Sequence, residues 1–170
     1  MTLISVTFNA IIALYNISKI KYIKSSMDKR TGRKRLKVKT LLINYLRRPA
    51  VFLDRDGTIN YDKGYTYKFS QFKFRPYVLK GLKYLSKKKY LIFIVTNQAG
   101  IAKGKFKLTE LLKLHKQLVA YLKKRNIFIS DIKFCPYHPK ALIKAYKKKS
   151  GYRKPGNLMI KQIIKKWKVN

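Results

Sequence analysis

Apolar and polar positions in residues 48–170 group into two kinds of segment. Two short, continuous apolar runs, residues 50–53 and 90–95, have the length and the lack of alternation that are typical of buried strands. Residues 127–134 are interpreted as a third strand. Longer segments between and after them carry apolar residues at helical spacing. Because strands that alternate with helices form parallel sheets with right-handed crossovers, the pattern predicts an α/β fold with a small parallel sheet.

Three helices are predicted from the amphipathic segments. Pro76 suits the first turn of the helix before the second strand. Thr109 has the side chain of an N-cap for the next helix, and residues 158–167 carry the apolar stripe of a last helix. His115 lies on the second of these helices, where we expect a packed or surface residue rather than a catalyst.

The charge of the chain is extreme. Its 170 residues include 42 lysines and arginines but only six aspartates and glutamates, so the formal net charge is +36. The two explanations are a lysine-rich composition spread over a solvated surface and a nucleic-acid-binding protein. The lysines are scattered through the strand–helix region, which favours compositional bias. Nonspecific adhesion to nucleic acid at low salt is still expected, and the same charge attracts anionic sugar phosphates.

Residues 1–47 are interpreted as a basic N-terminal extension of uncertain structure. Residues 3–20 are moderately apolar but are interrupted by Asn9 and Asn16, so an extension is favoured over a weak anchor or signal. Residues 28–39 are strongly basic and indicate a solvated linker or arm. Residues 48–170 form the second predicted unit. One cysteine excludes an intramolecular disulfide and fits a reducing cytoplasm.

The run D-R-D-G-T directly follows the first apolar strand. It contains Asp54 and Asp56, two of the six acidic residues of the whole chain. Ligand and catalytic groups gather outside the carboxyl ends of strands in open α/β sheets. One carboxylate can attack phosphorus, and a second can protonate the leaving oxygen and then activate water. The alternative is an ordinary strand-to-loop turn, and the preceding strand and the following D-G-T favour phosphoryl transfer.

Two later motifs supply phosphate-binding groups. T-N-Q ends the second strand with Thr96, Asn97 and Gln98, and the Thr96 hydroxyl and the backbone N–H groups of the following turn can bind phosphate oxygens. R-K-P then provides Arg153, whose planar guanidinium can grip a phosphate, and Lys154. An R-K pair is expected by chance in so basic a chain, but its order after the other motifs makes it more specific.

These motifs together resemble the haloacid dehalogenase (HAD) superfamily. D-R-D-G-T-I-N, V-T-N-Q-A-G-I-A-K-G, C-P-Y-H-P and R-K-P-G-N-L-M resemble its histidinol-phosphatase and heptose-bisphosphate-phosphatase branch, with the heptose 1,7-bisphosphate members the closer match. The resemblance covers residues 48–170. It implies a Rossmann-like sheet with helices on both faces and no large cap domain.

The resemblance also implies roles for the motif residues. Asp54 is the nucleophile and a Mg²⁺ ligand, and Asp56 is the general acid/base with its backbone carbonyl on the metal. Thr96 and Lys154 hold the phosphoryl group, Asn97 and Gln98 shape the same phosphate-binding pocket, and Arg153 contacts the substrate. Many relatives in this branch also carry structural zinc.

Two departures from the family pattern are visible. The first concerns zinc, which takes four Cys or His ligands in structural sites. Cys135 keeps one such position, but Tyr137, Ser150 and Tyr152 occupy the others, and His138 is displaced. We therefore expect no structural zinc, with Cys135 a buried apolar residue.

The second departure is the fourth motif, G-D followed by another acid, which completes the Mg²⁺ site in the superfamily. No acidic residue follows Lys154. The chain is therefore expected to be a truncated family member with little activity of its own, and a chain that carries the fourth motif is expected to be active. If the chain hydrolyses substrate without the fourth motif, Asp62 or Asp131 would have to complete the Mg²⁺ site.

The leading hypothesis is a monomeric, cytoplasmic, Mg²⁺-dependent phosphatase of a sugar bisphosphate, most closely heptose 1,7-bisphosphate at its 7-phosphate. The enzymatic alternative is a histidinol-phosphate phosphatase. The nonenzymatic alternative is a basic nucleic-acid-binding protein on a decayed HAD scaffold, in which exposed aromatics stack on bases. The aromatics in question are Tyr65, Tyr67, Phe69 and Phe72. A structured loop at the sheet edge is the favoured interpretation of these four residues.

Overall fold

The computed structural model of the chain describes residues 48–169. The predictions for residues 1–47, including the apolar stretch and the basic cluster, lie outside the described residues. The elements in chain order are β1 (Ala50–Leu53), η1 (Phe69–Gln71), α3 (Val78–Lys87), β2 (Leu91–Asn97), α4 (Ala99–Ala102), α5 (Leu108–Lys123), β3 (Ile129–Cys135), η2 (Lys144–Tyr146) and α6 (Leu158–Trp167).

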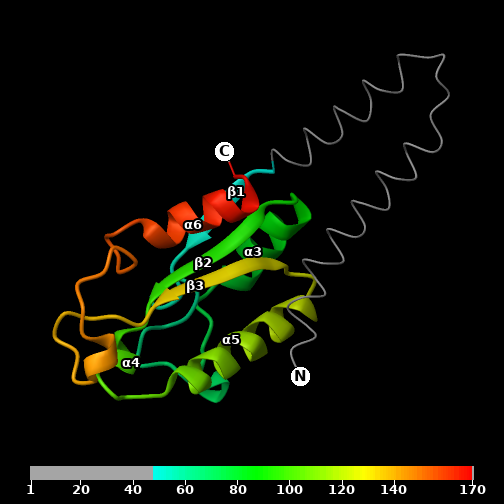
Figure 1. Cartoon of the computed structure of the whole chain (residues 1–170). Coiled ribbons are helices and arrows are strands. Elements are labelled where there is room, and N and C mark those ends of the chain that lie inside the picture. Colours follow the sequence, from blue (N-terminus) through cyan, green and yellow to red (C-terminus); the bar gives the residue numbers. More distant parts are fainter. Residues whose placement is uncertain (1–47, 170) are drawn as a thin grey trace, which may run out of the picture. The chain divides into compact units, whose positions relative to one another are not determined.

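The three strands form one parallel sheet in the order β1-β2-β3 (Figure 1). Leu53 of β1 pairs with Ile94, and Asn97 at the end of β2 pairs with Cys135. The central strand β2 is buried along its length except at Asn97, as its unbroken apolar run predicts. The predicted α/β class and the parallel sheet are confirmed.

Alternate residues of β2 belong to two separate cores. Ile92 and Ile94 join a cluster with α3 and α5, which includes Leu82 and Leu118. Leu91, Phe93 and Val95 instead join a cluster with Met159 and Ile163 of α6. Since side chains of a strand alternate between the faces of the sheet, helices cover both faces, as predicted (Figure 1). The part of the chain that the structure describes contains no large cap domain.

Three predicted boundaries were wrong by a few residues. β2 extends through Asn97, and β3 runs from Ile129 to Cys135 rather than over 127–134. α5 begins at Leu108 after Lys107, so Thr109 lies inside its first turn and does not cap it. The physical reason is Glu110, whose carboxylate accepts the free backbone N–H of Lys107 at 2.8 Å and favours the earlier start.

The aromatic segment before α3 packs against the rest of the domain. Tyr67 stacks on Phe106 with ring centroids 5.2 Å apart, Phe69 contacts Tyr121 at 5.4 Å, and Phe72 is buried. The favoured interpretation as a structured loop is therefore confirmed. Base stacking would require free rings, and of these aromatics only Tyr65 is strongly exposed. Within residues 48–169, no helix has both the length and the apolar character needed to cross a membrane.

The core cluster on α5 predicts the effect of two matched leucine substitutions. Leu118 is fully buried, whereas Leu112 on the same helix is 48% exposed. Leu118→Ala should lower the free energy of unfolding by about 2–5 kcal/mol because it opens a cavity. Leu112→Ala should change it by only about 0.5 kcal/mol. Chemical denaturation measures both, and equal losses would contradict the described packing of α5.

Candidate active site

The carboxyl ends of the three strands carry most of the predicted site residues. Asp54 directly follows β1, Thr96 and Asn97 end β2, and Cys135 ends β3. Because the strands are parallel, these ends lie at one edge of the sheet. This edge is where α/β folds place ligands, and it brings Lys154 of the late R-K-P motif next to the first strand.

Asp54 is paired with a lysine from the last motif. Its Oδ2 forms an ion pair with Lys154 Nζ, and its Oδ1 accepts the backbone N–H of Arg55 at 2.8 Å. The side chains of Asp54 and Lys154 are 38% and 28% exposed, so both can meet a ligand from solvent. The structure therefore joins the predicted nucleophile to the predicted phosphate-binding lysine.

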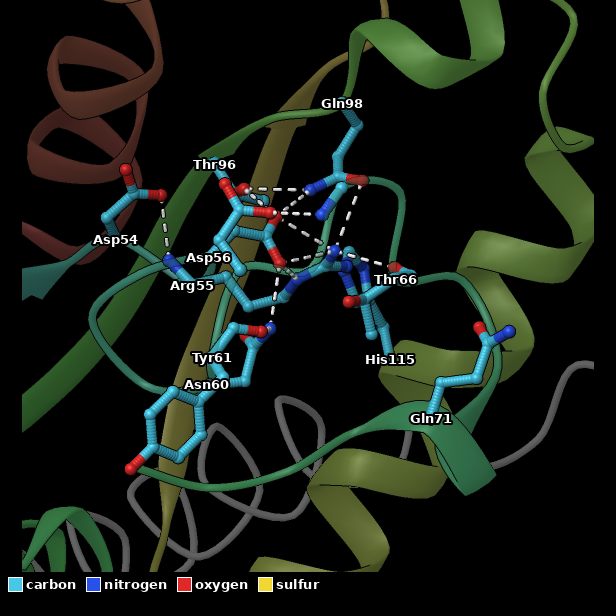
Figure 2. Close-up of polar contacts among 12 residues, drawn as sticks. Asp54, Arg55, Asp56, Asn60, Tyr61, Thr66, Gln71, Thr96, Gln98 and His115 are labelled. Atoms are coloured by element: carbon cyan, nitrogen blue, oxygen red, sulfur yellow. Dashed lines mark hydrogen bonds and ion pairs between the residues drawn. The ribbon is translucent and has the colours of Figure 1, made fainter. Parts of the chain in front are cut away.

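Asp56 accepts hydrogen bonds on both carboxylate oxygens (Figure 2). Its Oδ1 accepts from Asn60 Nδ2 at 3.0 Å, and its Oδ2 accepts from Gln98 Nε2 at 2.7 Å and from Thr96 Oγ1 at 3.4 Å. Arg55 Nη2 donates to both oxygens at 2.9 Å. Gln98 Nε2 also donates to Thr96 Oγ1 at 2.9 Å, so the T-N-Q motif is tied to the first motif.

Arg55 is a site residue whose role the sequence did not indicate. Its side chain is fully buried, and besides Asp56 it donates to the Thr66 carbonyl at 2.8 Å and to Gln98 Oε1 at 3.3 Å. Its Nη1 lies 3.1 Å from His115 Nε2. Burial lowers the pKa of Arg55, and the charge of Asp56 opposes that shift. The available signal was an arginine directly between two aspartates at a strand end.

His115 is packed beside this guanidinium, which confirms the prediction of a packed residue. Burial, and secondarily the positive charge of Arg55, lower its pKa from the ordinary 6.5 to about 3. The ring is therefore neutral at pH 7, and its Nε2 can accept the hydrogen bond from Arg55.

The turn after Asp56 depends on a glycine. Gly57 has φ +77°, a left-handed conformation that glycine adopts without steric cost. Its N–H donates to the Asn60 carbonyl at 2.9 Å, and Arg75 Nη1 donates to the Gly57 carbonyl at 2.9 Å. This tight turn returns Asn60 to the carboxylate of Asp56.

A cavity of about 390 Å³ opens beside this network. Of the predicted site residues, Asp56, Asn97, Gln98 and Arg153 line it, while Asp54, Thr96 and Lys154 do not. Nη1 of Arg153 is buried without a hydrogen-bond partner among the described residues, as expected for a donor that awaits an anion. Asp62, considered above, also lines the cavity, and the sequence missed further lining residues in the loops and at helix α4: Gly64, Tyr65, Thr66, Ala99, Gly100, Lys103 and His138.

The two acids considered as substitutes for the fourth motif lie in different places. Asp62 lines the cavity. Asp131 lies early in β3, and its Oδ2 accepts from Lys166 Nζ at 2.8 Å and from Trp167 Nε1 at 3.3 Å. Asp131 therefore ties β3 to α6 and does not serve the site.

The oxygen donors beside β1 fit a Mg²⁺ ion. Asp54 offers a carboxylate that is partly exposed, and the Asp56 backbone carbonyl accepts no hydrogen bond among the described residues. Mg²⁺ is commonly held by one or two carboxylates, waters and a substrate phosphate. Within residues 48–169, no group of three or more His, Cys, Asp or Glu side chains could enclose a metal.

The loop after β3 is held by tyrosines. Lys148 Nζ lies 3.9 Å above the Tyr137 ring, and Tyr152 OH is hydrogen bonded to Gln162. Cys135 is fully buried, as predicted, and burial raises the pKa of its thiol. The Ser150 hydroxyl accepts the N–H of Tyr152 at 3.3 Å.

Paired aspartates at the carboxyl edge of a parallel sheet, with a lysine on the first of them, define the class as a HAD-like phosphatase domain. A family model described as polynucleotide kinase 3 phosphatase matches residues 50–170. The chain belongs to this family, within the phosphatases of the HAD superfamily. The predicted resemblance is confirmed.

Several curated relatives carry the name D-glycero-beta-D-manno-heptose-1,7-bisphosphate 7-phosphatase, among them the two described here. The protein from Rhodopseudomonas palustris is 37% identical over 124 residues, which are 73% of this chain and 69% of the relative. The protein from Photorhabdus laumondii is 43% identical over 107 residues, 63% of this chain and 57% of the relative. The chain thus spans between about half and two thirds of the length of these relatives.

Two crystal structures share the fold. A protein from Mesorhizobium loti, assigned as a HAD-like phosphatase, has a TM-score of 0.67 and 28% identity over 72% of this chain and 59% of its own. D,D-heptose 1.7-bisphosphate phosphatase from B. bronchiseptica, complexed with magnesium and phosphate, has a TM-score of 0.63 and 24% identity. The match covers 71% of this chain and 64% of that protein. These similarities support the sheet and helix arrangement described above.

The buried His115 predicts a pH dependence of stability. The unfolded chain binds a proton near pH 6.5 but the folded chain only near pH 3, so the free energy of unfolding falls as the pH drops through this interval. His115→Gln keeps an acceptor for Arg55 and removes this proton uptake. Between about pH 7 and pH 4, the wild type should therefore lose roughly 3 kcal/mol more than the variant.

Urea denaturation at the two pH values measures this difference. His138→Gln is the matched control. The pKa of His138 is also lowered, by slight desolvation and by the charges of Arg153, Lys103 and Lys140, but its ring is only partly buried, so this variant should retain most of the wild-type pH dependence. Parallel pH profiles for the wild type and His115→Gln would contradict a neutral, buried His115.

Proposed function

We propose that this protein is a Mg²⁺-dependent phosphatase that removes the 7-phosphate of heptose 1,7-bisphosphate. The observation that carries the proposal is the Asp54–Lys154 ion pair beside the hydrogen-bonded Asp56 at the carboxyl edge of the sheet. The names of the Rhodopseudomonas and Photorhabdus relatives support this substrate and a place in carbohydrate metabolism.

The proposed reaction proceeds in two steps through a phosphorylated Asp54. An oxygen of Asp54 forms a bond to phosphorus while the bond to the sugar oxygen breaks, and Asp56 donates a proton to that oxygen. Water then attacks the aspartyl-phosphate, Asp56 takes its proton, and phosphate and free Asp54 result. Lys154 and the Thr96 hydroxyl hold the phosphoryl group, and the free Nη1 of Arg153 contacts the substrate.

The metal requirement follows from the oxygen donors. The Asp54 carboxylate and the Asp56 backbone carbonyl would hold Mg²⁺, which supplies charge stabilisation for the phosphoryl oxygens when bound. Because the described residues contain no cluster of three acidic or imidazole side chains, we expect weak Mg²⁺ affinity and a slow absolute rate. Substrate phosphate would provide part of the coordination.

Two other functions are outcomes of the same assay. Histidinol phosphate is the alternative small substrate of this branch. The net charge of +36 and the description of the matching family model favour, as the second alternative, a 3′-phosphorylated oligonucleotide. We also propose that the protein is a cytoplasmic monomer, and sedimentation measures its oligomeric state.

The nucleophile is tested by Asp54→Asn. This variant keeps the size of the side chain but removes the carboxylate that would attack phosphorus, so Mg²⁺-dependent release of phosphate should fall at least about a thousandfold. Phosphate release from heptose 1,7-bisphosphate, histidinol phosphate and a 3′-phosphorylated oligonucleotide is measured with Mg²⁺ or with chelator.

Asp131→Asn is the matched control for this experiment, since Asp131 contacts α6 and should leave turnover unchanged. Wild-type activity in Asp54→Asn would remove the covalent mechanism. A preference for histidinol phosphate or the oligonucleotide would assign the corresponding alternative, and no Mg²⁺-dependent release from any substrate would reject the proposal.

We also propose that the protein carries no structural zinc. Tyr137 packs against Lys148, Ser150 and Tyr152 are hydrogen bonded, and these three side chains provide neither thiolate nor imidazole. Elemental analysis of protein purified without chelator should find far less than one zinc per chain. One tightly held zinc per chain would show that this interpretation of the loop is wrong.

A further inference from the structure

The amide side chain of Asn97 is bonded on both of its polar atoms to the backbone of one residue. Asn97 Oδ1 accepts the Lys154 N–H at 3.0 Å, and Asn97 Nδ2 donates to the Lys154 carbonyl at 3.3 Å. The two residues are 57 positions apart in the chain. A side chain at the end of the central strand thus binds the loop that carries the site lysine.

This contact matters because Lys154 lies outside regular structure. The loop before α6 turns on itself: Arg153 N–H donates to the Ser150 carbonyl at 3.0 Å and Gly156 N–H to the Arg153 carbonyl at 2.7 Å. A Cβ on Gly156 would lie 2.7 Å from the Arg153 oxygen, so the turn leaves room only for glycine. These bonds shape the loop internally, whereas Asn97 joins it to the sheet.

We propose that Asn97 is a positioning residue that acts on a bound phosphoryl group only through Lys154. A lysine side chain is long and flexible, so the place of its backbone decides where Nζ can reach. Asn97 holds that backbone so that Nζ meets Asp54 Oδ2. The inference rests on the proposed phosphoryl site and adds a residue that orients its cation.

The competing explanation is direct contact between Asn97 and the anion, because Asn97 also lines the cavity. The second N–H of Asn97 Nδ2 could donate to an anion without breaking either bond to Lys154, so the two explanations must be separated by experiment. The side-chain amide of the neighbouring Gln98 likewise binds another residue of the site, since it donates to Asp56 Oδ2 at 2.7 Å.

A double-mutant cycle on inorganic phosphate separates these explanations. Phosphate is titrated into the wild type, Asn97→Ala, Lys154→Ala and the double variant, with Mg²⁺ present. Binding is followed by NMR at the backbone amides of residues 153 and 154, so that adhesion elsewhere on the basic chain is not counted. Each single variant should bind about tenfold to a hundredfold more weakly. The double variant should bind no more weakly than Lys154→Ala.

Hydrogen exchange at the residue-154 amide provides a second measurement that does not depend on phosphate. Asn97→Ala should accelerate exchange, whereas Asn97→Asp keeps an oxygen acceptor and should restore protection. Asp131→Asn, which removes a tie between β3 and α6, is the control and should change neither exchange nor phosphate affinity.

Several results would overturn the inference. Additive losses in the double variant would indicate direct contact of Asn97 with phosphate. Unchanged affinity or unchanged exchange in Asn97→Ala would remove the positioning role, and so would a wild type whose residue-153 and residue-154 amides do not respond to phosphate. If the effects of Asn97→Ala and Lys154→Ala on phosphate affinity are coupled but the protein hydrolyses no substrate, the proposed function is rejected and the positioning role remains.

Discussion

The buried guanidinium of Arg55 is the constraint on which the rest of the site depends. A charge removed from water is costly unless it is paired and all its donors find acceptors. Arg55 meets this condition through the Asp56 carboxylate, the Thr66 carbonyl and the Gln98 side chain, with His115 as a further acceptor. One side chain therefore joins the first motif, the loop that borders the cavity, the end of β2 and helix α5.

Two adjacent side-chain amides at the end of β2 each bind a different charged residue of the site. Asn97 bonds the backbone of Lys154, and Gln98 bonds the carboxylate of Asp56. The central strand is buried on both faces and pairs with a strand on each side. The arrangement places a cation and a carboxylate from distant segments at one edge, with a cavity between loops beside them.

The sequence by itself determined the class of fold and the position of the site along the chain. The unbroken apolar run at residues 90–95 identifies a strand that is buried on both faces, and it forms the central strand of the observed three-stranded sheet. Asp54, Asp56 and Thr96 could be selected because motifs at strand ends converge on one edge in such sheets, whereas Lys154 could be selected only from the resemblance of R-K-P to the family motif. Helix boundaries were less certain, since a local bond such as Glu110 to Lys107 decides where α5 begins.

Only the tertiary structure decided how these residues bind one another. Side-chain partners separated by tens of residues leave no local pattern, so the sequence could not show that Asn97 holds Lys154 or that His115 meets Arg55. Burial is likewise a property of the packed chain. The sequence could not show that the arginine in D-R-D is buried and bonded to several segments of the site. The loops supply Lys103 and His138 to the cavity for the same reason, because irregular segments are placed by packing rather than by periodicity.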